Sequence, residues 1–275
     1  MAQQLTWLAT VLENAGLKVA ECPGWQNRGR PSPMGAIKGV MCHHTVGLKN
    51  GNMPSLNVLI NGRSELPGPL AQLGLGRDGT FYIIAAGRCN HAGKGAWKGE
   101  IDGNSSFIGI EAENTGGDKN PPGPKDPPFD PWPAVQLDAY RRGVAAILSH
   151  VGVSADMCCA HREYALPKGR KPDPHTIDMQ QFRKDVKALM GGITLPPPLI
   201  KNKDVRDRPT LRRGGATNPK FLVEELQRKV GFTGQQVDGK FGPSTEARVR
   251  QFQRDHGLVP DGIVGPKSWI ELDKV

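Results

Sequence analysis

The chain has 275 residues, a length that predicts about two domains. It carries 36 Lys and Arg against 27 Asp and Glu, a formal net charge of +9. No apolar run approaches the roughly 18 residues of a membrane span, which excludes a protein built on transmembrane helices. The positive charge favours a polyanionic partner, either nucleic acid or an anionic cell wall.

The N-terminal segment predicts a short amphipathic helix rather than a signal peptide. Leu5, Leu8 and Leu12 recur at helical spacing. The segment lacks the basic start and unbroken apolar core of a secretory signal, and Glu13 and Asn14 stand where a cleavage site would be. We therefore expect a protein made in the cytoplasm without a Sec-type export address.

The five cysteines are an odd number and show no C-x-x-C spacing. This argues against a disulfide framework and against a thiolate zinc site. The adjacent Cys158 and Cys159 are expected to be buried as small apolar residues.

Residues 1–190 predict an α/β domain. Apolar runs rich in β-branched residues, which predict strands, alternate with amphipathic segments, which predict helices. The strands are expected within 36–45, 76–87 and 106–114, and the longer helices within 133–152 and 176–189. Strands flanked by helices form a sheet that the helices cover.

The segment 191–219 predicts a basic linker. Three consecutive prolines, 196–198, favour an extended chain, and Gly214 and Gly215 favour flexibility. Residues 201–220 carry seven Lys or Arg against two Asp, a composition poorly able to form a core.

Residues 220–275 contain an internal repeat. The pattern D-G-x-x-G-P occurs at 238–243 and again, 23 residues later, at 261–266. In each copy Asp-Gly predicts a tight turn, and Gly-Pro predicts the N-cap and first residue of a helix. With a further helix expected over 221–231, the repeats predict a compact three-helix domain.

This domain resembles the peptidoglycan-binding domain that is appended to many cell-wall hydrolases. The resemblance rests on both D-G-x-x-G-P turns and on the stretches "LQRKVG", "RQFQRDHGL" and "GPKSW". It implies that residues 220–275 anchor the protein to peptidoglycan.

In the first domain, the stretch "VMCHHTVG" places His43 and His44 at the end of a predicted strand. Successive side chains of a strand point to opposite faces, so the two histidines can hardly serve one site. Within 158–175, a loop by composition, His161 and Asp173 can return to one point. A histidine from the first strand would complete a His/His/Asp set of the kind that binds catalytic zinc.

Three further residues leave alternatives open. Lys171 faces the same pocket if the chain from it to Asp173 is extended, and is otherwise a solvated loop charge. His175 either caps a helix that begins near Thr176 or serves as a substitute ligand. His91 lies in the loop "CNHAGKG", where a histidine either contacts substrate or is solvated.

Four stretches carry a second resemblance: "GVMCHHTVG", "GRDGTFYIIAAGRCNHAGKG", "NSSFIGIEAEN" and "AHREYALPKGRKPDPH". In this order they resemble the zinc-dependent N-acetylmuramoyl-L-alanine amidases of type 2, over about residues 35–185. The resemblance implies a mixed central sheet flanked by helices, the fold shared with peptidoglycan-recognition proteins. It also implies hydrolysis of the amide between N-acetylmuramic acid and L-alanine.

The same resemblance implies roles for single residues. The implied zinc ligands are His43, in an H-x-T pattern, His161 and Asp173. Glu111, in the "GIE" motif, would move the proton, and Lys171 would stabilise the oxyanion. Glu113 points to the same face as Glu111 and is either a neighbour of the site or a charge on its rim.

Three other functions compete with the amidase. A recognition protein would bind peptidoglycan without cutting it, but such proteins lose a ligand and this chain keeps Asp173. A nucleic-acid binder fits the charge, yet no aromatic-basic interleaving or helix-turn-helix pattern supports it. A zinc endopeptidase of the stem peptide would use the same metal chemistry.

A wall hydrolase with a C-terminal wall-binding domain and no signal peptide is typical of phage endolysins. The first domain most resembles endolysins of phages that infect actinobacteria. We expect the protein to stay in the host cytoplasm until a holin opens the membrane, and then to reach the wall. Its expected partner is peptidoglycan, with no nucleic acid and no stable membrane association, and the chain is expected to be a monomer.

Overall fold

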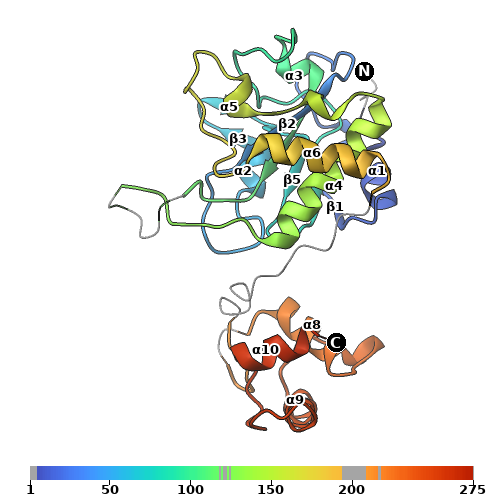
Figure 1. Cartoon of the computed structure of the whole chain (residues 1–275), viewed down its shortest axis with the longest axis vertical. Helices are drawn as coiled ribbons and strands as arrows, with labels where there is room; N and C mark the ends of the chain where they lie inside the picture. Colours follow the sequence, from blue (N-terminus) through green and yellow to red (C-terminus); the bar gives the residue numbers. More distant parts are fainter. Residues whose placement is uncertain are drawn as a thin grey trace. The chain divides into compact units, whose positions relative to one another are not determined.

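The computed structural model describes residues 5–117, 119, 123, 125–193, 209–215 and 218–274. The chain divides into two units, residues 1–199 and 200–275, and each is described by itself (Figure 1). Most of the expected linker, 191–219, lies outside the described residues. Within the described part, no helix is both long and apolar enough to cross a bilayer.

The first unit is built on a six-stranded sheet. Its strands are β1 (Val19–Glu21), β2 (Gly39–His44), β5 (Leu73–Leu75), β6 (Phe81–Ile83), β7 (Phe107–Ala112) and β8 (Cys158–Ala160). A separate hairpin joins β3 (Gly62–Arg63) to β4 (Leu66–Pro67). Among the residues that the structure describes in this unit, the α-helices are α1 (Leu8–Asn14), α2 (Leu56–Asn61), α3 (Gly103–Ser106), α4 (Ala134–Val151), α5 (His161–Tyr164) and α6 (Met179–Met190). Short 3₁₀ turns cover Trp25–Asn27 and Ala155–Met157.

The strand order is β1-β6-β5-β7-β2-β8, and the neighbours are parallel except for the antiparallel pair of β5 and β6. The predicted mixed α/β sheet is therefore confirmed. Pairing of β2 with β7 places His43 directly beside Glu111. Parallel strands end at the same edge of a sheet, which is where open α/β sheets bind ligands.

The two faces of the sheet are covered differently. Helices α1, α4 and α6 lie together over one face (Figure 1) and bury an apolar core that includes Val40 and Cys42. On the opposite face Met41 packs with Tyr164 of α5 and with loop residues. Because side chains alternate along a strand, His43 faces this second layer, which consists of short helices and loops. The sheet thus presents His43 where loops can bring other polar groups.

All five cysteines are free and buried, Cys158 and Cys159 among them as expected. The sulfur atoms of Cys42 and Cys158 lie 3.6 Å apart across the adjacent strands β2 and β8.

The start of α6 corrects one prediction. We expected His175 to cap a helix beginning near Thr176, but α6 begins at Met179 and its N-cap is Asp178. The Asp178 carboxylate accepts hydrogen bonds from two backbone N–H groups of the first turn, as a strong N-cap does. Thr176 has a φ of 58°, in the left-handed region, so it cannot belong to a right-handed first turn.

The second unit contains three α-helices among its described residues: α8 (Lys220–Lys229), α9 (Pro243–Asp255) and α10 (Pro266–Leu272). A 3₁₀ turn covers Gly234–Gln236. Gly242 and Gly265 are N-caps followed by proline at the first helical position, as the repeat predicted. Trp269 is fully buried in the apolar core of this unit. The expected helical C-terminal domain is confirmed.

Two buried glutamines hold the repeated turns. Gln227 on α8 donates to Asp238 Oδ1 at 2.8 Å and accepts from Gly239 N at 2.9 Å. Gln253 on α9 makes the same pair of bonds to Asp261 Oδ1, at 2.9 Å, and from Gly262 N, at 2.9 Å. Each D-G turn is therefore fixed by a glutamine side chain of the helix before it. The repeated sequence pattern thus corresponds to a repeated pair of hydrogen bonds.

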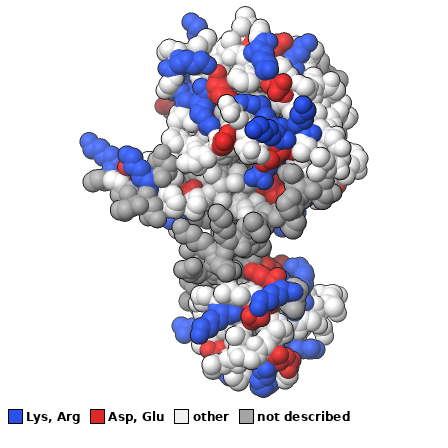
Figure 2. Space-filling view, in the orientation of Figure 1, with Lys and Arg blue, Asp and Glu red and all other residues white. Residues whose placement is uncertain are grey.

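The surface carries its positive charge in a mixed pattern. On the face shown in Figure 2, Lys and Arg side chains are interspersed with Asp and Glu on both units. Ion pairs between charged side chains include Arg183 with Glu163 at 2.8 Å and Arg250 with Glu246 at 2.8 Å.

Candidate metal centre

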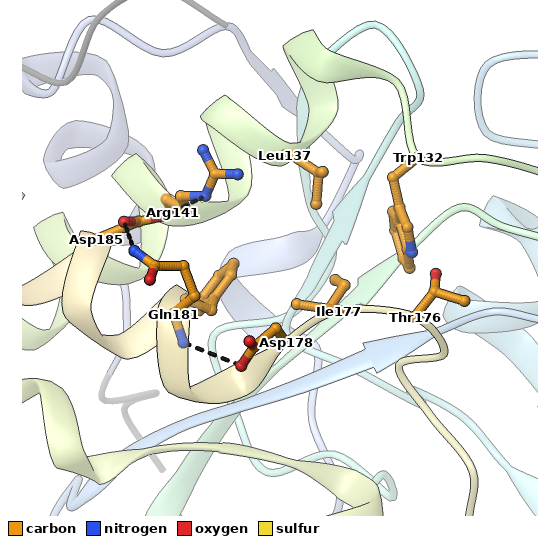
Figure 3. Close-up of a pocket in the computed structure, with 9 residues that line it drawn as sticks. Trp132, Leu137, Arg141, Thr176, Ile177, Asp178, Gln181 and Asp185 are labelled. Atoms are coloured by element: carbon orange, nitrogen blue, oxygen red, sulfur yellow. Dashed lines mark hydrogen bonds and ion pairs between the residues drawn. The ribbon is translucent and has the colours of Figure 1, made fainter.

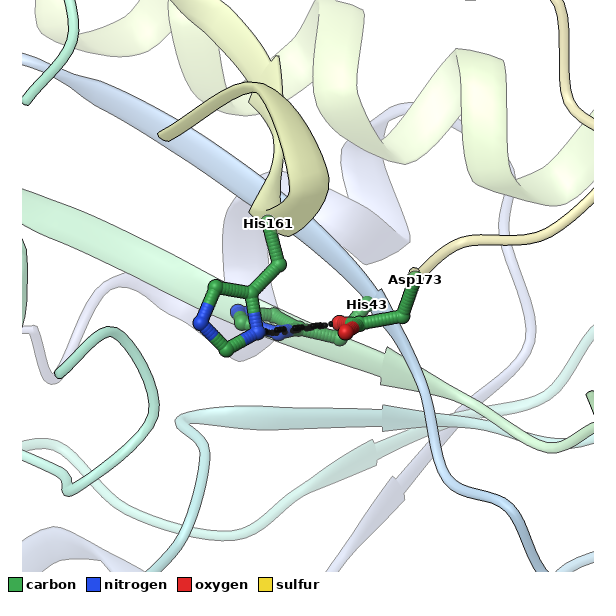
Figure 4. A group of neighbouring side chains, drawn as sticks. All are labelled: His43, His161 and Asp173. Atoms are coloured by element: carbon green, nitrogen blue, oxygen red, sulfur yellow. Dashed lines mark hydrogen bonds and ion pairs between the residues drawn. The ribbon is translucent and has the colours of Figure 1, made fainter. Parts of the chain in front are cut away.

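Three side chains from separate parts of the first unit meet at one point (Figure 4). His43 lies near the end of β2, His161 is the first residue of α5, and Asp173 follows on the next loop. The Nδ1 atoms of both histidines and Oδ2 of Asp173 lie 3.0 Å from one another. All three residues are buried. The structure thus brings together the His/His/Asp set, although the stretch expected to be a loop contains the helical turn α5.

The surroundings of His161 assign its tautomer. Its Nε2 lies 2.9 Å from the backbone oxygen of Ala92. A carbonyl oxygen can only accept, so Nε2 carries the hydrogen and donates it. In the neutral ring Nδ1 then presents a lone pair, and this lone pair points at His43 and Asp173.

His43 is assigned in two steps. His91 Nε2 lies 3.3 Å from the carbonyl oxygen of Phe107 and donates to it, which leaves His91 Nδ1 as an acceptor. His43 Nε2 lies 3.1 Å from that acceptor and therefore carries a hydrogen. His43 Nδ1 thus presents a second lone pair to the site. His91, which the sequence left as either solvated or in contact with substrate, is buried behind a candidate ligand.

Three electron-pair donors at 3.0 Å from one another repel unless a cation lies among them. Burial, aided by His161, lowers the pKa of His43 to about 4, which disfavours a proton on its Nδ1 near neutral pH. Two imidazole nitrogens and one carboxylate oxygen are the donor set of a catalytic zinc site with an open fourth position. Zinc bonds of about 2.0–2.1 Å put tetrahedral ligands about 3.3 Å apart, close to the separation seen here. The residues present fit zinc.

Glu111 stands beside this cluster. Its Oε1 lies 3.9 Å from His43 Nδ1, and its Oε2 is buried without a hydrogen-bond partner among the described residues. Burial raises the pKa of Glu111 well above its usual range, the charge of Asp173 raises it further, and Lys171 opposes both. A buried carboxyl oxygen that no protein group satisfies is suited to exchange a proton with a bound molecule.

Lys171 is half-buried and lies two residues before Asp173. Its positive charge opposes the rise in the pKa of Glu111 and adds to the fall in the pKa of His43. The structure thus brings together four of the five predicted site residues, His43, His161, Asp173 and Glu111. For Lys171 it gives an electrostatic influence on two of them, Glu111 and His43.

Two other residues lie outside the donor cluster. His44 faces the other side of β2, accepts from the backbone N–H of His175 at 3.2 Å and stacks on the His175 ring. His175 is thus a neighbour of His44 and does not join the donor atoms of His43. His175 therefore packs on His44. It neither caps α6 nor lies among the clustered donor atoms.

Glu113 is fully buried, so of its two alternatives, a neighbour of the site or a charge on its rim, the structure excludes the rim charge. Its carboxylate accepts from Thr45 Oγ1 at 2.7 Å, Ser55 Oγ at 2.9 Å and Ser55 N at 3.0 Å. These bonds tie the end of β7 to the chain that follows β2. Glu113 thus fixes the position of the segment that follows His43 in the chain.

A hollow of about 140 Å³ lies elsewhere, between α4 and α6 (Figure 3). Trp132, Ile177 and Phe182 give it an apolar floor, and Arg141 and Asp185 form an ion pair at 3.2 Å beside it. None of the clustered donors lines this hollow, so it is separate from the metal centre.

The sequence of the first unit matches a known family. The family model described as N-acetylmuramoyl-L-alanine amidase matches residues 33–176, more than half of the chain, and includes every residue of the donor cluster. The chain belongs to this family. A second model, for a peptidoglycan binding domain, matches residues 217–272.

Curated relatives match over shorter stretches. An uncharacterized protein in the bpoA1 3' region of Kitasatospora aureofaciens is 40% identical over 85 residues, 31% of this chain and 64% of that protein. The zinc D-Ala-D-Ala carboxypeptidase of Streptomyces albus G is 48% identical over 55 residues, 18% of this chain and 22% of the enzyme. The chain thus spans less than two thirds of the curated relatives it matches.

Solved structures of low identity also align. The N-acetylmuramyl-L-alanine amidase AmiD from E. coli aligns with a TM-score of 0.45 and 19% identity, over 90% of this chain and 91% of AmiD. The endolysin amidase LysCS from Clostridium intestinale aligns with a TM-score of 0.42 and 14% identity, over 62% of this chain and 95% of LysCS.

Proposed function

We propose that the chain is a zinc-dependent amidase that cleaves the bond between N-acetylmuramic acid and L-alanine in bacterial peptidoglycan. One observation carries the proposal: the lone pairs of His43, His161 and Asp173 converge beside the carboxyl group of Glu111, whose Oε2 has no hydrogen-bond partner among the described residues. Membership in the amidase family supports the choice of bond, and the match to a peptidoglycan binding domain supports the choice of polymer.

The chain's own residues divide the chemistry among them. His43, His161 and Asp173 would hold zinc, which when bound supplies a water of lowered pKa and polarises the scissile carbonyl. Glu111 takes a proton from the attacking water and passes it to the amine nitrogen, as the C–O bond forms and the C–N bond breaks. Lys171 stabilises the negative charge that develops on the carbonyl oxygen.

The second unit serves as the wall anchor in this proposal. Its support is the family match over residues 217–272. We extend the proposal to the biological role that the two-domain layout favours, that of a phage endolysin released by a holin to lyse its host. Lysis of a bacterial culture only after a holin is co-expressed would support that role, and lysis without any holin would contradict it.

Mass analysis of digested, purified peptidoglycan tests the activity. An amidase releases stem peptides with a free L-alanine N-terminus and leaves glycan strands with intact lactyl groups. Cut cross-links in place of these products would identify an endopeptidase. Binding to the polymer with no new ends of any kind would identify a recognition protein.

A further inference from the structure

The two candidate histidine ligands are oriented by adjacent residues of a single loop. His91 accepts from His43 Nε2 through its ring, and the backbone oxygen of Ala92 accepts from His161 Nε2. In the sequence His91 is 48 residues from His43 and Ala92 is 69 residues from His161, so one short segment sets the geometry of two remote side chains.

This segment is itself held by Asn104 of α3. The side-chain oxygen of Asn104 accepts from the backbone N–H of His91 at 2.9 Å and from that of Ala92 at 2.8 Å. One oxygen therefore fixes two consecutive peptide groups. Displacement of this oxygen would move the His91 ring and the Ala92 carbonyl together.

The sheet provides a matching space for His91. A Cβ atom on Gly109 would lie 2.7 Å from Cγ of His91, so only glycine at this position of β7 lets the imidazole lie against the strand. The ring of His91 meets that of His43 edge to face, at 5.2 Å between centroids. The Phe107 carbonyl, on the same strand as Gly109, accepts from His91 Nε2. The imidazole is thus seated on β7 and directed at His43.

We propose that Asn104 and His91 are positioning residues for metal binding: they hold His43 and His161 as the tautomers whose Nδ1 lone pairs face Asp173. Neither residue belongs to the donor group of His43, His161 and Asp173. The inference rests on the proposed zinc site. It adds the residues that orient the two histidine ligands of that site. Partners of this kind typically change metal affinity about 10- to 100-fold when they are removed.

The first experiment measures zinc affinity of the full chain by competition with a chelator. His91→Phe keeps a ring of similar shape but removes the acceptor, and we expect zinc affinity to fall about 10- to 100-fold. Asn104→Leu should weaken it similarly, whereas Asn104→Asp keeps an acceptor oxygen and should restore binding close to that of the unaltered protein. Asn90→Ala is the matched control, because Asn90 lies in the same loop but its side chain donates to the Pro67 carbonyl instead.

The second experiment reads the tautomers directly, by ¹⁵N NMR of the histidine rings in zinc-free protein. In the unaltered chain His43 and His161 should both be protonated at Nε2. In His91→Phe only His43 should lose this preference, because His161 still donates to Ala92. In Asn104→Leu both should lose it.

Two outcomes would overturn the inference. One is unchanged zinc affinity in folded His91→Phe protein, and the other is an unchanged His43 tautomer. If Asn104→Leu does not fold, His91→Phe alone decides. Failure of the unaltered chain to bind zinc would contradict the proposed function instead, and the tautomers of the zinc-free protein would still show whether the loop orients the two rings.

Discussion

His43 and Glu111 are register partners across the parallel strands β2 and β7, and Glu111 Oε1 lies 3.9 Å from His43 Nδ1. This pairing ties a candidate metal ligand to a candidate proton carrier through the backbone of the sheet, not through flexible loops. Sites supported on strands are held more precisely than sites on loops. The backbone positions from which the two side chains extend are therefore fixed by the pairing of β2 with β7.

The paired histidines give the first prediction. His43→Ala should abolish stoichiometric zinc binding, because it removes one of three donors, whereas His44→Ala should keep the metal, since His44 packs on His175. Elemental analysis of the purified variants measures bound zinc. Loss of zinc in His44→Ala with retention in His43→Ala would reverse the assignment.

Glu111→Gln should retain zinc and lose turnover. The substitution keeps the shape of the side chain but removes the group that carries the proton, a change that costs about 10²- to 10⁴-fold in rate. Release of stem peptides from purified peptidoglycan measures the rate, and elemental analysis on the same sample measures zinc. Loss of zinc along with activity would make Glu111 a ligand.

The buried histidines predict how stability depends on pH in the zinc-free protein. Burial lowers the pKa of both His43 and His44 from 6.5 to about 4. Between these values the unfolded chain takes up protons at these two histidines that the folded chain does not. Their contribution to the free energy of unfolding is therefore complete above pH 6.5 and falls as the pH drops toward 4. Each histidine contributes up to about 3 kcal/mol to this loss.

Urea denaturation at a series of pH values measures the effect. His44→Asn keeps an oxygen that can accept from His175 N but cannot titrate, so its stability should decrease less steeply between pH 6.5 and 4. An equal slope in both proteins would show that His44 does not contribute.

The two glutamines that hold the repeated turns, Gln227 and Gln253, give a prediction about the stability of the second unit. Gln253→Ala leaves the Gly262 N–H and one acceptor position of Asp261 without their partner, which should cost about 1–3 kcal/mol. Gln227→Ala should have a comparable effect at the other turn. Thermal unfolding of the full chain should show a lower transition temperature for the second unit and an unchanged transition for the first.

Removal of residues 220–275 should separate binding from cleavage. Sedimentation with purified cell walls should show a smaller bound fraction, while hydrolysis of a small soluble muropeptide should continue at an unchanged rate. Loss of the soluble activity as well would show that the first unit depends on the second. Undiminished sedimentation would place the wall anchor in the first unit.

Much of the candidate site could be predicted from the sequence because its residues stand in short motifs that follow one another in a fixed order. Resemblance to the family selected His43 from the histidine pair, and the stretch from His161 to Asp173 supplied the other two donors. In the second unit, the repeated D-G-x-x-G-P pattern predicted both turns and the helix starts that follow them, since Gly and Pro restrict the backbone locally.

Features that depend on contacts between remote segments could not be predicted from the sequence. The burial of Glu113, the packing of His175 on His44, and the path from Asn104 through His91 to His43 each join residues that are far apart in the sequence. The helix start was also missed: we expected it near Thr176, but the left-handed backbone of Thr176 delays it to Met179, and a residue type alone does not reveal such a conformation.

The sequence by itself determined the local chemistry of this protein: which residue types alternate along β2, where the turns fall, and which side chains can donate to a metal. Only the tertiary structure decided the direction in which each imidazole presents its lone pair. A ring nitrogen becomes donor or acceptor according to its neighbour, and the neighbours of His43 and His161 are a loop that folding brings against them.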